Sequence, residues 1–167
     1  LASWDCHEAV HVVSALLADW FCFGEEKSLQ AARELLDLQM QTWQGIVEVQ
    51  NNRKRPYSIH LTSLGIEYSL LKMYQATGDT KYLDFACNTC GLDKLDWPIQ
   101  LNRFAPLLGH TYLYLHHCRC QLELYQVRPN PALLRMSQRA LKFMLGGNGM
   151  SISGGVGQAE CWTDDQD

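Results

Sequence analysis

Residues 74–86 read YQATGDTKYLDFA and join two segments that have helical periodicity. Before the turn, apolar residues recur every three or four positions at Ile66, Leu70 and Met73, which is the spacing of one face of an α-helix. The polar residues ATGDTK interrupt this pattern, and apolar residues resume after them. The stretch therefore predicts a helical hairpin, with a long helix, a short turn and a second helix.

The same hairpin pattern occurs on both sides of this stretch. Aligning Trp20, Tyr74 and Tyr125, which lie 54 and 51 residues apart, places a leucine nine residues after each of them. A small residue follows three positions later in every case, and the corresponding turns read FGEEKS, ATGDTK and VRPNPA. Because stacked hairpins bury faces that one hairpin cannot, we expect an all-α fold of three hairpins, in an open solenoid or in part of an (α/α)6 toroid. The aligned leucines and small residues are Leu29, Leu83, Leu134, Ala32, Ala86 and Ser137.

Composition narrows the class of protein. The 167 residues are 47% hydrophobic, enough for a core, and the net charge is −4. Nucleic-acid binders concentrate Lys and Arg on one face, whereas the basic cluster here is Arg53–Arg55, which is typical of a solvated loop. No run approaches the roughly 18 apolar residues that a membrane span needs. We therefore expect neither a nucleic-acid partner nor a membrane partner.

Seven cysteines do not suggest a disulfide framework, because the number is odd. Cys22, Cys87, Cys118 and Cys120 lie in helical segments, where buried thiols are common. Cys87 and Cys90 form a single C-x-x-C, which without a second pair is a weak zinc signal. We expect these thiols to pack in the core and no metal to be held by this chain.

The last residues, 151–167, read SISGGVGQAECWTDDQD and follow a glycine-rich stretch that begins at Gly146. Glycines allow sharp turns and a close approach of the main chain to a ligand. Glu160 lies here among small residues, a thiol and the indole of Trp162, an environment that predicts a raised pKa and a general-acid role. We expect residues 146–167 to form an active-site loop.

Three motifs, in this order, resemble the catalytic (α/α)6 domain of glycoside hydrolase family 127, the family of β-L-arabinofuranosidases. They are GDTKYLDFA (78–86), LGHTYLYL (108–115) and SGGVGQAE (153–160), and the third is the most specific. The resemblance implies that the chain is an incomplete glycoside hydrolase domain with a carbohydrate substrate. It also implies a retaining mechanism in the complete enzyme.

The resemblance implies roles for three residues. Glu160 corresponds to the family's general acid/base, although the family's GEAF is AECW here. His110, in the Gly-His motif, corresponds to a sugar-binding residue, and His11 is the nearest counterpart of an early sugar-contacting histidine, without the glycine that precedes it in the family. The nucleophile, a zinc-bound cysteine, would lie downstream of this chain. We therefore expect these 167 residues to be inactive alone.

Two further residues are candidates from their surroundings. His60 follows Tyr57 and Ser58 at a predicted helix start and could line the cavity. Trp162 lies beside Glu160, and an indole face can pack on a sugar ring, whereas we expect Trp97 to plug a hairpin junction. Two of the histidines also have structural interpretations: His11 as a buried histidine bonded to a neighbouring helix, and His7 as structural or exposed.

Two other function classes stay open. One is a non-catalytic helical-repeat module that binds a glycan or a protein, and the other is another toroid enzyme of sugars, such as an epimerase. An incomplete ring would expose an apolar edge, so we also expect self-association of the chain. The sequence leaves the compartment open between cytoplasm and periplasm.

Overall fold

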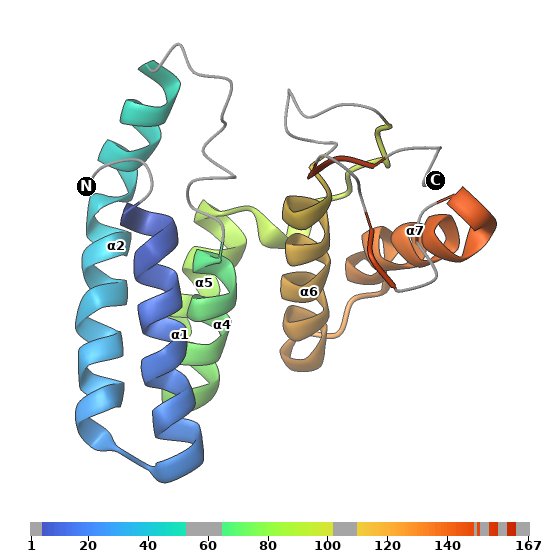
Figure 1. Ribbon diagram of the computed structural model, residues 1–167. Helices are drawn as coiled ribbons and strands as arrows, with labels where there is room; N and C mark the ends of the chain where they lie inside the picture. The colour runs from blue at the N-terminus through green and yellow to red at the C-terminus, as the bar shows by residue number, and fades with distance from the viewer. Residues whose placement is uncertain are drawn as a thin grey trace. The chain divides into compact units, whose positions relative to one another are not determined.

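The computed structural model describes residues 5–52, 65–101, 110–148, 150, 154–156 and 160–162. The chain divides into two compact units, residues 1–92 and 93–167, and each is described by itself. The described residues are mostly helical (Figure 1). Among them, strand-like pairing is limited to isolated β-bridges.

The first unit contains two consecutive helical hairpins. Helices α1 (Asp5–Phe23) and α2 (Glu26–Asn52) form the first hairpin, and α4 (Ile66–Thr77) and α5 (Thr80–Asp84) form the second. A π-helical turn, Phe85–Thr89, extends α5. Helix α1 lies against both α2 and α4 (Figure 1).

Glycine ends the first helix of both hairpins in the first unit. Gly24 and Gly78 each adopt a φ of 71°, a left-handed conformation that side chains disfavour, and each donates its N–H to a carbonyl four residues earlier. Asp79 then accepts a hydrogen bond from the N–H of Lys81 at 3.1 Å and caps the start of α5. In the second hairpin a glycine therefore ends the first helix and an aspartate begins the next.

The second unit holds the third predicted hairpin. Helix α6 (Thr111–Val127) is followed by a 3₁₀ turn, Pro131–Leu134, and by α7 (Arg135–Phe143). The side chain of Asn130 accepts from the N–H of Ala132 at 3.0 Å, so an asparagine cap replaces the aspartate cap of the second hairpin.

The core of the first unit is built by the faces that the apolar spacing predicted. Fully buried side chains of α1 and α4 meet between the helices, and Ala32 and Ala86, which the repeat aligned, are both 0% exposed. The small alanine side chains allow neighbouring helices to approach closely at both positions. The main core residues are Val10, Val13, Leu17, Leu36, Ile66, Leu70 and Met73.

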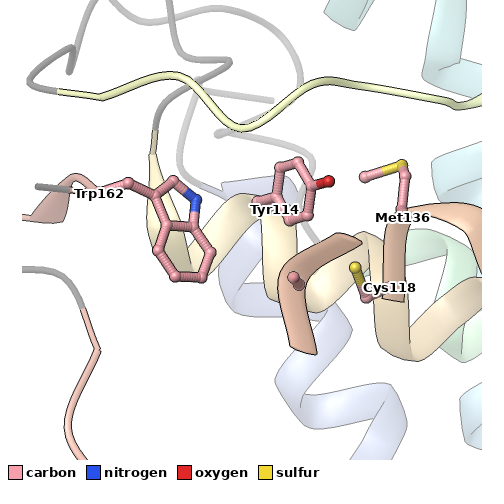
Figure 2. Close-up of a cluster of buried hydrophobic side chains, with 5 residues drawn as sticks. Tyr114, Cys118, Met136 and Trp162 are labelled. Atoms are coloured by element: carbon pink, nitrogen blue, oxygen red, sulfur yellow. The ribbon is translucent and has the colours of Figure 1, made fainter. Parts of the chain in front are cut away.

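The core of the second unit gathers around one tryptophan. Trp162 is 0% exposed and makes edge-to-face contacts with Tyr114 and Phe143, at ring-centroid distances of 5.9 and 5.3 Å. Cys118, Met136 and further residues of α6 and α7 complete the cluster (Figure 2). Residues 160–162 are therefore anchored to α6 and α7 through the indole of Trp162.

The predicted all-α class and the three hairpin turns are confirmed, while the toroid and the single catalytic domain stay predictions.

All seven cysteines are free thiols. The expectation of a buried thiol is wrong for Cys22, which is exposed on α1. No helix in the described ranges is both long and apolar enough to cross a membrane.

Candidate functional site

His110 stands at the N-terminus of α6 and caps it. Its Nδ1 accepts a hydrogen bond from the N–H of Leu113 at 3.2 Å. Because Nδ1 acts as the acceptor, the neutral ring carries its proton on Nε2. The helix start therefore sets both the tautomer and the orientation of this imidazole.

Glu160 is brought to His110 by backbone pairing. Cys161 forms an antiparallel bridge with His110, and Trp162 forms a parallel bridge with Leu101. Glu160 itself has a φ of 62°, the left-handed region that non-glycine residues rarely occupy. Such a conformation costs on the order of 1 kcal/mol and is found disproportionately at functional sites.

The side chains of His110 and Glu160 face each other. Nε2 of His110 lies 3.8 Å from Oε2 of Glu160, beyond hydrogen-bond length but within the range of an ion pair. The imidazole is buried and the carboxylate is exposed, with side-chain exposures of 5% and 69%. Burial lowers the pKa of His110 below its ordinary value, against the opposing effect of the negative charge of Glu160. The site therefore presents a neutral N–H donor beside an accessible carboxyl group.

The surroundings of Glu160 differ from those expected. The sequence placed its carboxyl group among a thiol and an indole, but the side chain is mostly in solvent and Trp162 points into the core. The expectation that Trp162 stacks on a sugar is therefore not supported, since a fully buried indole has no face open to a ligand. Its Nε1 is buried without a hydrogen-bond partner in the described part of the chain.

An aromatic residue that the sequence analysis did not single out lies at the pair instead. Tyr112, in the first turn of α6, is 50% exposed, and its ring centroid is 6.3 Å from that of His110. Its exposed face is available to a ligand, which the face of Trp162 is not. The sequence feature that could have pointed to Tyr112 is its position two residues after the capping histidine in LGHTYLYL.

The other predicted sugar-binding histidines are not brought to this pair by any described contact. His11 belongs to α1 in the first unit, where it is exposed and its Nε2 lies 3.4 Å from Nε2 of His7. The alternative interpretation of His11 as a buried histidine is wrong. His60 lies outside the described residues.

Trp97 contacts the helices of the second unit through its backbone and its ring. Its backbone carbonyl accepts from the hydroxyl group of Tyr114 at 2.9 Å and from the guanidinium group of Arg139. Arg139 also donates to Asp96 at 2.8 Å. Residues 96 and 97 are thus tied to α6 and α7, and the ring of Trp97 lies edge-to-face with His117.

The resemblance puts its zinc ligands downstream of these 167 residues. The described residues contain no group of three or more His, Cys, Asp or Glu side chains arranged to hold a metal ion. Burial also raises the pKa values of the Cys90 and Cys118 thiols, that of Cys118 to about 11, which disfavours the thiolates that zinc requires. The buried thiols of Cys90 and Cys118 are therefore poor zinc ligands.

Comparison with protein-family models, with curated proteins and with solved structures finds no match to this chain. The assignment of a function therefore depends on the motifs and on the geometry of His110 and Glu160.

Proposed function

We propose that this chain is part of a glycoside hydrolase and supplies the acid/base carboxyl group, Glu160, together with a sugar-binding donor, His110. The observation that supports it is the 3.8 Å approach of Nε2 of His110 to the Glu160 carboxylate. His110 and Glu160 belong to two of the three motifs that carried the resemblance and are 50 residues apart in sequence, and the bridge between His110 and Cys161 brings them together.

Each group has a distinct role in glycosidic bond cleavage. Protonated Glu160 would donate its proton to the leaving oxygen and, as a carboxylate, would then take a proton from the attacking water. A sugar that covers the exposed carboxyl group would remove water from it and favour the protonated acid. His110, held with its proton on Nε2, would donate a hydrogen bond to a sugar hydroxyl or to the carboxylate.

The nucleophile is assigned to no described residue of this chain. In the proposed enzyme the three hairpins form part of an (α/α)6 toroid, and the resemblance puts the cysteine nucleophile and its zinc downstream. When bound, zinc would keep that thiol deprotonated at neutral pH. β-L-arabinofuranosides are the proposed substrate class, on the resemblance alone.

A sugar epimerase is the second proposal, because a neutral imidazole beside a carboxylate can also exchange protons with a substrate carbon. An epimerase needs its two proton-transferring groups on opposite faces of the sugar. His110 and Glu160 lie side by side, which favours hydrolysis.

The test is ligand binding to the purified chain. Methyl β-L-arabinofuranoside is titrated with methyl β-D-glucopyranoside as the control sugar. NMR follows the imidazole of His110 in the natural chain and the backbone amide of Leu113, which bonds to His110, in every variant. His110→Asn keeps a capping side chain but removes the Nε2 donor. We expect it to weaken binding about five- to tenfold, the value of about 1 kcal/mol for one hydrogen bond.

The matched control is Glu123→Gln, which lies in the C-terminal half of α6 while His110 caps its N-terminus, and it should leave binding unchanged. Transfer of deuterium from solvent to C2 of free L-arabinose, whose open-chain aldehyde acidifies that C–H bond, would favour the epimerase instead. Absence of any shift at His110 at saturating sugar would refute both proposals.

A further inference from the structure

Two histidines of α1 converge on one point of an exposed helix face. His7 and His11 are four residues apart, so their side chains lie one turn apart on the same face. Their Nε2 atoms approach to 3.4 Å, and their rings are almost perpendicular, at 82°. Neither ring is in the core: His11 is exposed and His7 is half-buried.

The separation of the two nitrogens suits a shared metal ion. Zinc binds imidazole nitrogen at about 2.0–2.1 Å, usually with tetrahedral geometry, which places two ligand nitrogens about 3.3–3.4 Å apart. An N–H···N hydrogen bond would favour a shorter distance, near 3.0 Å. The observed 3.4 Å therefore matches two ligands of one tetrahedral ion.

The sequence of residues 7–11 also indicates a metal-binding site. Residues 7–11 read HEAVH, an H-E-x-x-H pattern in which two histidines one helical turn apart bind zinc. Glu8 is exposed in the same turn, and its negative charge favours a nearby cation. Helix α1 is continuous through all five residues, so the spacing is rigid.

We propose that His7 and His11 form a binding site for a divalent first-row metal ion, best fitted by Zn²⁺. The site is separate from the thiolate zinc implied by the resemblance and independent of the proposed hydrolase function. It uses two imidazole ligands, and water completes the coordination, because no third ligand lies close among the described residues. The open positions leave the ion accessible to a ligand's own donor atom.

The experiment is a titration of the reduced, purified chain with ZnCl₂ by calorimetry, with NMR of the histidine rings. We expect one Zn²⁺ per chain and perturbed ring signals of both His7 and His11. His11→Gln should weaken this binding about 100-fold, because the second of two linked ligands is lost.

A register control separates this site from general histidine content. The double variant His11→Gln/Val12→His keeps the number of histidines but moves one to a five-residue spacing, on a different side of the helix; Val12 is 52% exposed and tolerates the change. It should bind as weakly as His11→Gln. Full-strength binding by either variant, or unperturbed ring signals at saturating Zn²⁺, would overturn the proposal and indicate thiol binding or none.

Discussion

A buried glutamate should make the first unit less stable as the pH rises through neutrality. Glu67 lies in the first turn of α4 with 5% of its surface exposed, and burial raises its pKa from 4.5 to about 7. The backbone N–H groups of Glu67 and Gly65 offset this only in part. Burial raises the pKa values of the neighbouring Cys6 and Cys90 thiols, and the charge of Glu67 adds to both shifts.

The sign and size follow from proton linkage. Between pH 4.5 and about 7, folded Glu67 keeps its proton while the unfolded chain has released it. The stabilisation is therefore complete below pH 4.5 and is lost as the pH rises to about 7. At about 1.4 kcal/mol for each pKa unit, the loss is about 3 kcal/mol.

The perturbation is Glu67→Gln, which has nearly the same shape and cannot ionise. We expect it to be about as stable as the natural chain at pH 4.5 and more stable by up to about 3 kcal/mol at pH 8. Urea unfolding followed by circular dichroism at several pH values measures the difference. Glu8→Gln, at an exposed position of α1, is the control for removing a glutamate side chain and should not reproduce the gain in stability at pH 8.

The result that would refute this reasoning is a constant stability difference between Glu67→Gln and the natural chain from pH 4.5 to 8. It would mean that Glu67 is solvated or becomes charged in the folded protein at the same pH as in the unfolded chain.

Three other predictions concern the turns and the site. His110→Ala should destabilise the second unit by about 1 kcal/mol and His110→Asn much less, because asparagine also caps a helix; thermal unfolding compares them. Trp162→Ala should cost about 3–5 kcal/mol in urea unfolding, whereas a solvent-facing indole would cost little. Gly78→Ala should lower stability by about 1 kcal/mol because its φ is 71°, and an unchanged melting temperature would contradict the left-handed turn.

The histidine and glutamate of the site illustrate the limit of sequence reasoning. The motifs singled out His110 and Glu160, but nothing in their spacing showed that the imidazole would be buried and the carboxylate exposed. For Trp162 the prediction failed, because an indole beside a predicted acid is equally suited to a ligand and to a core. The sequence did not single out Glu67, because a glutamate in the first turn of a helix usually lies in solvent, where its charge interacts favourably with the helix dipole.

The sequence by itself determined the hairpins. Helical spacing, Gly24 and Gly78, and the caps at Asp79 and Asn130 all act within a few residues, so local chemistry is sufficient to predict them. Only the tertiary structure decided which distant residues meet: the bridges of Cys161 with His110 and of Trp162 with Leu101 place the carboxylate beside the imidazole and the indole in the core. These contacts join segments about 50 or more residues apart, and they depend on how the helices bury their apolar surface together, which no local pattern encodes.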